Sequence, residues 1–432
     1  MITANIGRLF LQAYNEKFQT SYDAKGFFTE VYHPLFFDSN KYLQWMQNSP
    51  FVQMSKGQKV ETLTPDERQV KLEEFHQKVD EKRFDASMFL GAAASEEKEF
   101  ATTSGQVTNL PLAYEANDIY LSWIGSSLGV GVSGGLSFLF MQPEILLDIF
   151  DGWQVYRTVL NQNETLKGNQ MNTWNAQWLI HKYSRGFCPQ NPMANFNPFE
   201  TSTGGMTVAV ASWIQLLIAL ARHYEQPQMM AYIYNFGQTN TTVGFIPLFL
   251  AHIRKPIQLY ERLFGMDESY KAEPLWGNPK GLRSSCKRGS IGLEAMEPSA
   301  LQNEWRNDKT VLKYKNTDEN QRILFQTYKI WLMAMLNNEE LWAKSEEFAK
   351  ALKLYLTSDA KKNSTVRKNR IETLLTAYGK KALVTAATEM MDQSETSVLL
   401  VEMVKLINMM PDDNVPYFMA LIKFQYVTIS NQ

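Results

Sequence analysis

The sequence predicts an α+β protein, in which a mixed α/β N-terminal region over residues 1–310 is followed by an all-helical bundle over residues 317–432. Three observations predict this class. β-Branched, aromatic and glycine residues concentrate between residues 100 and 140, which is typical of strands. Helix start and stop signals punctuate the rest of the first region. From residue 317 onward only helical patterns occur.

The first elements are predicted to be helical, with aromatic packing between them. A helix is expected over residues 4–17, and the aromatic cluster at residues 27–37 is expected to form packed loop and a short strand. Thr64 can cap a second helix, because Pro65 suits the first helical position and Glu67 completes a capping box. This helix should run to about residue 84.

Two strands are predicted in the middle of the first region, over residues 119–124 and 136–140, around a glycine-rich connection. Pro143 then opens a helix that should reach about Leu160.

Turn-rich and apolar segments alternate in the remainder of the first region. Residues 186–205 are rich in proline and asparagine, and they precede a candidate buried helix at 208–224. Residues 273–298, rich in Gly, Ser and Pro, are expected to be an exposed loop or a domain linker.

Six helices are predicted in the bundle, over residues 318–337, 339–356, 364–378, 380–392, 395–410 and 414–428. Between Val398 and Met410 the only polar residues are Glu402, Lys405 and Asn408. Nearly the whole circumference of that helix is apolar, so it should lie in the middle of the bundle.

Composition excludes several classes of protein. With 44% hydrophobic and 20% charged residues, the chain is not of the disordered class. The longest nearly apolar run, residues 208–221, includes Ser212 and Gln215 and is too short to cross a bilayer. Residues 1–20 lack the pattern of a signal peptide, which makes the cytoplasm the expected compartment. No membrane partner is expected.

The charge balance bears on nucleic-acid binding. Lys and Arg number 43 against 45 Asp and Glu, a formal charge of −2. A free-standing nucleic-acid binder usually has a basic excess, but a subunit whose partners supply most phosphate contacts does not need one. The two cysteines, Cys188 and Cys286, provide no four-cysteine zinc site, so neither metal nor cofactor is expected.

Two catalytic or cofactor motifs overlap in the glycine-rich connection. Residues 129–134 match GxGxxG, but that motif must open a helix, and here residues 136–140 favour strand. Residues 131–135 match the GxSxG nucleophile elbow, with His181, His223 and His252 as conceivable bases for Ser133. An α/β serine hydrolase using Ser133 is therefore the alternative function, and a glycine-rich hairpin is the structural alternative.

Basic and amide-rich segments favour a different function. Residues 280–290 and 361–370 contain clustered cations and no acid, and such segments form either solvated faces or phosphate contacts. The candidate backbone-contacting residues are Lys280, Arg283, Lys287, Arg288, Lys361, Lys362, Arg367, Lys368 and Arg370. The polar segment 102–109 could form a hairpin turn or read base edges, with Ser104, Gly105, Gln106 and Asn109 as candidates.

Residues 103–107, the glycine-rich stretch 119–135 and the C-terminal helices together resemble the large subunit of type I CRISPR surveillance complexes (Cascade), most like the type I-B branch. Some relatives in that branch carry a pair of zinc-binding CxxC motifs. Single cysteines, Cys188 and Cys286, stand in comparable loop contexts here, so no zinc knuckle is expected.

The resemblance implies a non-enzymatic antiviral role in RNA-guided recognition of DNA. The large subunit of such a ribonucleoprotein inspects the short motif (PAM) that flanks the target, helps to open the duplex and holds the displaced strand. The implied partners are the other Cascade subunits, a guide RNA, double-stranded target DNA and a recruited nuclease-helicase. Because guide pairing provides most of the sequence specificity, the protein needs to read only a few base pairs.

Overall fold

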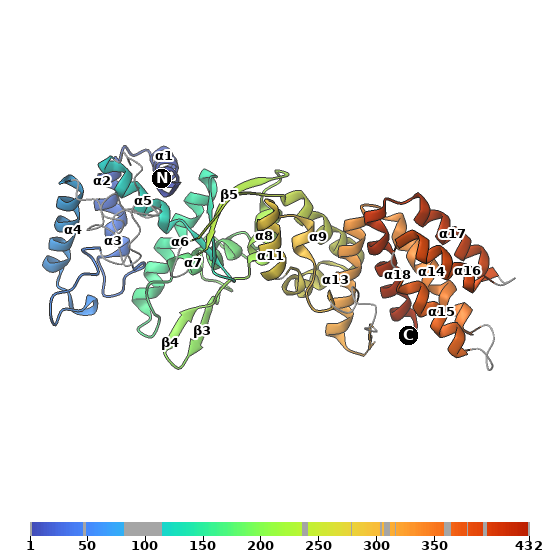
Figure 1. Cartoon of the computed structure of the whole chain (residues 1–432). Helices are drawn as coiled ribbons and strands as arrows, with labels where there is room; N and C mark the ends of the chain where they lie inside the picture. Colours follow the sequence, from blue (N-terminus) through green and yellow to red (C-terminus); the bar gives the residue numbers. More distant parts are fainter. Residues whose placement is uncertain are drawn as a thin grey trace. The chain divides into compact units, whose positions relative to one another are not determined.

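The α+β class is confirmed by a computed structural model of the chain (Figure 1). It describes residues 2–45, 49–81, 115–235, 241–277, 279–302, 305, 312–315, 317–357, 364–377, 379–391 and 395–430. Two compact units emerge, one of residues 1–224 with 228–248 and one of residues 225–227 with 249–432. The expected division at 310–317 lies inside the second unit and stays a prediction about independent folding.

Two helices of the first unit cross at glycines, α1 (Ile2–Phe18) and α5 (Ala116–Ser127). A Cβ on Gly7 would lie 2.0 Å from the carbonyl oxygen of Leu121, and one on Gly125 would lie 1.9 Å from that of Thr3. The strand predicted over 119–124 is wrong, because these residues form the middle of α5. Their β-branched and aromatic side chains are buried on a helix instead of a sheet.

The aromatic cluster that was expected as loop and short strand is helical. It forms a nearly continuous run of helical turns whose rings are buried among other aromatic side chains. Phe28, for instance, stacks on Phe75 with ring centroids 4.9 Å apart. The run consists of α2 (Ala24–Phe27), η1 (Phe28–Tyr32) and α3 (His33–Phe36).

The capping box predicted at Thr64 is confirmed. After a single turn of helix, η2 (Val60–Thr62), comes α4 (Pro65–Asp80). The Thr64 hydroxyl accepts a hydrogen bond from the Glu67 N–H at 3.2 Å, and the Glu67 carboxylate accepts one from the Thr64 N–H at 2.8 Å. The bond from the Thr64 N–H to the carboxylate lowers the pKa of Glu67.

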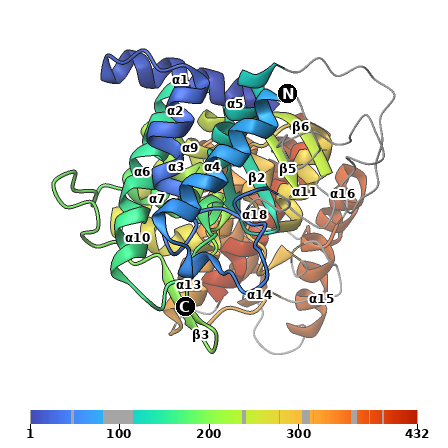
Figure 2. The same ribbon diagram turned by 90° about the vertical axis from the view of Figure 1, so that its left-hand side faces the viewer.

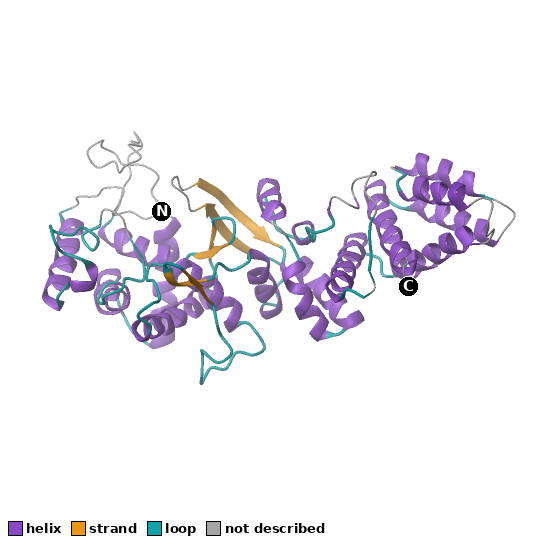
Figure 3. Ribbon diagram, turned by 90° about the horizontal axis from the view of Figure 1, so that it is seen from below, coloured by secondary structure: helices purple, strands orange, loops and turns teal. Residues whose placement is uncertain are grey.

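The first unit contains a four-stranded antiparallel sheet in the order β1-β2-β5-β6, whose strands are orange in Figure 3. The strand predicted at residues 136–140 is confirmed as β2. β1 and β2 form the hairpin around the glycine-rich connection, and β5 and β6 form a longer hairpin beside it. The strands are β1 (Val130–Val132), β2 (Leu136–Phe140), β5 (Met229–Asn235) and β6 (Thr241–Leu248).

Three helices and a second hairpin complete this unit. The helix predicted at Pro143 is confirmed as α6, whose packing on α7 is fixed by Lys182, 2.7 Å from carboxylate oxygens of both Asp148 and Asp151. The buried helix expected over 208–224 begins later, because its first residue ends a strand. The elements are α6 (Pro143–Gln162), α7 (Met171–Lys182), β3 (Phe199–Ser202), β4 (Gly205–Val208) and α8 (Trp213–His223).

The second unit opens with helices where the sequence predicted an exposed loop or linker. Residues 273–298 contain α11 and two single turns of helix, so that expectation is wrong. The elements before the bundle are α9 (Leu250–Phe264), α10 (Met266–Ala272), η4 (Glu273–Leu275), α11 (Pro279–Arg288) and η5 (Leu293–Met296).

All six helices predicted for the C-terminal bundle occur. They are α13 (Glu319–Leu336), α14 (Glu340–Thr357), α15 (Ser364–Leu375), α16 (Gly379–Met390), α17 (Glu395–Met409) and α18 (Val415–Ser430), with the turn η6 (Asp412–Asn414) before the last. Figures 1 and 2 both show α15 beside α16 at one end of the bundle, where the two helices pack together. No helix among the described residues is long and apolar enough to span a membrane.

The helix at the centre of the bundle is not the predicted one. α18 packs against α13, α14, α15 and α16 and buries Phe418, Leu421 and Phe424 completely. α17 packs mainly on α14 and α16 and leaves Val398 71% and Met409 85% exposed. The apolar circumference of α17 did not predict its position in the bundle, because part of this apolar surface remains in contact with water.

Candidate nucleic-acid interface

The first basic segment folds as the amphipathic helix α11. Leu282 and Ser285 are each 1% exposed and form its buried face. Pro279 occupies the first helical position, which suits its fixed φ angle and missing N–H group. The helix ends before Gly289, whose φ of +85° belongs to the left-handed region that favours glycine.

Three cations form a stripe along the opposite face of α11. Lys280, Arg283 and Lys287 are exposed, and their spacing of three and four residues places them on one side of the helix. α11 contains no acidic residue. Within the described parts of the chain, none of the three forms an ion pair or a side-chain hydrogen bond. We call these three residues the α11 stripe.

Arg288, the fourth candidate cation of this segment, is already engaged. Its guanidinium lies 2.7 Å from a carboxylate oxygen of Glu294 and donates a hydrogen bond to the Ser285 hydroxyl at 3.2 Å. Arg288 therefore has less positive charge to offer a phosphate than the α11 stripe has. It lines a cavity of about 430 Å³ together with His252 and Met335.

The second basic segment is divided between structural and exposed residues. Arg367, on α15, donates a hydrogen bond to the carbonyl of Tyr355 at 2.6 Å, and its guanidinium carbon lies 4.7 Å from the centroid of the Tyr355 ring. Arg370 donates to the hydroxyl of the same tyrosine at 3.2 Å. Lys368 is exposed. Lys361 and Lys362 lie outside the described residues.

The candidate base-reading residues Ser104, Gly105, Gln106 and Asn109 also lie outside the described residues. Their proposed role therefore rests on the sequence.

The geometry around Ser133 differs from that of a nucleophile elbow. Ser133 lies in the turn of the β1–β2 hairpin, and its N–H donates to the carbonyl of Ala211 at 2.8 Å. An elbow places the serine between a strand and a helix, whereas here a strand follows. His181 stacks on Phe196 and bonds to the carbonyl of Pro192 at 2.9 Å.

The glycines of this hairpin have a packing role. A Cβ on Gly131 would lie 3.2 Å from Cβ of Asn172, at the start of α7, so a side chain would crowd this contact. In the part of the chain that the structure describes, no three His, Cys, Asp or Glu residues gather as a metal site. The Cys286 thiol is half-buried, and burial raises its pKa.

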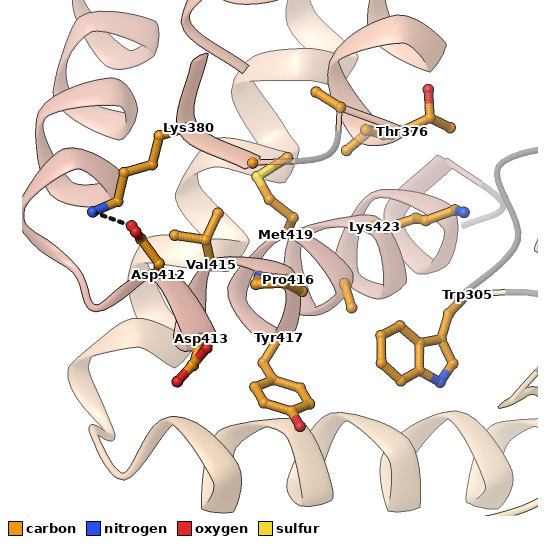
Figure 4. A pocket seen from close by; sticks show the side chains of 14 residues that line it. Trp305, Thr376, Lys380, Asp412, Asp413, Val415, Pro416, Tyr417, Met419 and Lys423 are labelled. Atoms are coloured by element: carbon orange, nitrogen blue, oxygen red, sulfur yellow. Dashed lines mark ion pairs between the residues drawn. The ribbon is translucent and has the colours of Figure 1, made fainter. Parts of the chain in front are cut away.

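A cavity of about 760 Å³ opens between the ends of α15, α16 and α18 (Figure 4). Lys380 and Asp412 pair across it at 2.7 Å, and Asp413 and Lys423 also line it. Two lysines and two aspartates give this lining no net charge. Because the anionic side chains would repel a phosphate, the cavity is a weaker candidate for nucleic acid than the α11 stripe.

Comparison with protein-family models, curated proteins and solved structures finds no match to this chain. The candidate interface is therefore defined by its own geometry. Sequence reasoning located the cations of α11 but missed the helix that aligns them. The sequence contained the pattern of an amphipathic helix. The cations are spaced by three and four residues, and Leu282 and Ser285 are three residues apart on the other face.

Proposed function

We propose that this chain is the non-catalytic large subunit of a type I CRISPR RNA-guided surveillance complex, acting in the cytoplasm on double-stranded DNA. The observation that carries the proposal is the α11 stripe, three exposed cations aligned on a helix without an acidic residue. Cations aligned in this way can contact the phosphates of a nucleic acid without regard to its sequence. The sequence resemblance supplies the class of complex.

The proposed division of labour accounts for the charge of the chain. Guide RNA pairing reads the target, and other subunits hold the RNA, so a formal charge of −2 is compatible with binding. The large subunit then needs a local basic surface, which the stripe provides. A nuclease-helicase recruited to the complex would perform the chemistry.

The decisive experiment tests the stripe in the assembled complex. Tagged protein, expressed with its genomic neighbours, should first co-purify with a discrete guide-sized RNA. The combined K280A, R283A and K287A variant should then bind DNA more weakly and with a flatter salt dependence. Each lost duplex phosphate contact should lower the log–log slope by ~0.9. The loss should be uniform across flanking sequences.

A matched control uses exposed lysines elsewhere in the same unit. The K313A, K381A and K405A variant removes three exposed surface charges, as the stripe variant does, and its salt slope should stay close to that of the parent protein. R288A should have a smaller effect than any stripe substitution, because Glu294 already neutralises Arg288. Equal slopes for the stripe variant and the control would refute the proposal.

Flank reading is assigned to the polar segment 102–109. Q106A and N109A should each cost ~1–3 kcal/mol on the preferred flanking sequence and less on a wrong one. Titrations on matched and mismatched flanks would separate this effect from that of the stripe. Unchanged flank discrimination in both variants would place the reader elsewhere in the chain.

A further inference from the structure

A second cavity, of about 580 Å³, lies in the first unit between the β1–β2 hairpin and the start of α7. Its volume is within the range of small-molecule sites, ~300–1,000 Å³. Among the described residues that line it, none is charged. The lining includes Trp45, Gly134, Gln170, Asn172 and Thr173.

Gln44 and Trp45 form one wall of the cavity, and the residues that precede them, 41–43, are anchored to other parts of the first unit. The Lys41 amine donates hydrogen bonds to the carbonyls of Asn163, Glu164 and Leu166, at 2.7, 2.8 and 2.8 Å. A Cβ on Gly168 would lie 2.6 Å from the carbonyl oxygen of Tyr42, so the two segments approach more closely than another residue would allow. This wall is therefore shaped before any ligand arrives.

Trp45 lines this cavity and is 44% exposed. Its backbone N–H donates to Oδ1 of Asn169 at 2.5 Å, and the N–H of Asn169 donates to the carbonyl of Tyr42 at 2.8 Å. A large aromatic ring that is anchored by its backbone and open to water is suited to stacking against another flat ring.

The polar groups of the cavity are amides and a hydroxyl. Gln170 is already engaged, because its side-chain oxygen accepts a hydrogen bond from the N–H of Val208 at 2.9 Å. Among the described residues, nothing hydrogen-bonds to the side chains of Asn172 or Thr173. Both can donate and accept, which matches the mixed donors and acceptors on the edge of a nucleobase.

The β1–β2 hairpin contributes Gly131, Gly134 and Gly135 to the lining of the cavity. A Cβ on Gly134 would meet nothing within 4 Å, and the φ of this residue, +91°, belongs to the left-handed region that favours glycine. At this position the hairpin tip lines the cavity without a side chain. An uncharged lining with an open edge fits a base inside and its phosphates outside.

We propose that this cavity holds one unpaired nucleobase of a single-stranded nucleic acid, stacked on Trp45 and hydrogen-bonded by Asn172 and Thr173. The proposal deepens the proposed function, on which it rests for the source of the strand. In an opened duplex, the displaced strand supplies unpaired bases. A base held here would oppose reannealing because it could not return to its partner.

The test uses the full chain and a ten-nucleotide abasic DNA strand that carries a single 2-aminopurine. The all-abasic strand is the comparison, since it retains every phosphate and lacks the base. The strand with the base should bind about tenfold more tightly, and its fluorescence should be quenched by stacking. Equal affinities for the two strands would overturn the proposal.

Three variants identify the ring and the amide. W45A should abolish both the tenfold preference and the quenching, whereas W45F should retain most of each because a ring remains. N172A should reduce the preference. The control F245A removes another half-exposed ring, on β6, and should change neither. A preference that survives W45A would overturn the proposal.

Two further measurements separate the cavity from the α11 stripe, and a nucleic-acid strand from a free nucleotide. The K280A, R283A and K287A variant should keep the ratio of the two affinities, because it changes none of the described residues that line the cavity, so loss of the ratio in W45A alone distinguishes the cavity from the α11 stripe. If the stripe variant keeps the salt slope of the parent protein on duplex DNA, the proposed function loses its support while the cavity keeps its own. The mononucleotide dAMP should compete for the cavity more weakly than the strand does. Equal competition would overturn the proposal that the cavity holds a base of a nucleic-acid strand.

Discussion

The amine of Lys329 lies 5.4 Å from the centroid of the Trp342 ring, inside the C-terminal bundle. Lys329 is 7% exposed and donates a hydrogen bond to the side-chain oxygen of Gln425 at 3.3 Å. Burial lowers its pKa from 10.5 to about 8, with Glu346 opposing the shift weakly. The bundle therefore contains a cation that would be more stable in water.

We expect K329M to stabilise the protein. The native lysine loses its proton near pH 8 and the unfolded lysine near pH 10.5, so between these values the unfolded chain binds more protons and parent stability rises with pH. The advantage of K329M should be up to ~3 kcal/mol below pH 8 and vanish above pH 10.5. Urea unfolding at several pH values measures it. K350M, at an exposed site on α14, is the control. If K329M stabilised the protein equally at every pH, the lowered pKa of Lys329 would not be the cause.

G125A should destabilise the first unit. The new Cβ would lie 1.9 Å from the carbonyl oxygen of Thr3, so α1 and α5 would have to separate. Overpacking of this kind costs ~1–3 kcal/mol or more in the free energy of unfolding. G186A is the matched control, because a Cβ there meets nothing within 4 Å. Comparable midpoints of urea unfolding for the two variants would show that the crossing tolerates a methyl group.

Arg367 and Lys368 should respond differently to alanine. R367A removes a hydrogen bond and a ring contact to Tyr355, so it should lower the free energy of unfolding by ~1–2 kcal/mol. K368A leaves packing intact and should affect only nucleic-acid binding. Thermal unfolding and DNA titration of both variants would separate the roles. A stable R367A variant with weakened DNA binding would instead support the contact predicted from the sequence.

The two possible domain boundaries can be compared with fragments. Tyr260 donates a hydrogen bond to Gln326 at 3.2 Å, and Arg322 pairs with Glu268 at 2.7 Å, which ties α9 and α10 to α13. A fragment of residues 249–432 should therefore melt cooperatively and at a higher temperature than residues 317–432. Equal melting temperatures would favour the boundary at 310–317. Limited proteolysis within 278–316 of the full chain is a second readout.

Local signals predicted much of the fold. The Thr64 capping box, the proline at 143 and the six bundle helices were readable because caps and breakers act over a few residues. Residues 119–124 were misassigned because their β-branched and aromatic side chains suit strands, while packing against α1 selects a helix. Long-range contacts of this kind leave no local mark.

The candidate sites show the same limit. The sequence showed the cations at 280–288. It did not show that they share one face of a helix, because a loop over the same residues would not align them. Nothing in the sequence brings Trp45 and Asn172 to one cavity, since the loop closure through Lys41 and Gly168 depends on tertiary packing. The amide-rich run at 169–172 was visible, but the exposure of Trp45 was not.

The central place of α18 has a consequence for biosynthesis. α18 follows the other five bundle helices in the chain, so the ribosome releases it after them. Until then, the apolar faces that Phe418, Leu421 and Phe424 will cover on the neighbouring helices stay open to water. The bundle thus completes its core only after this helix leaves the exit tunnel, and chaperone binding to nascent chains should peak just before that point.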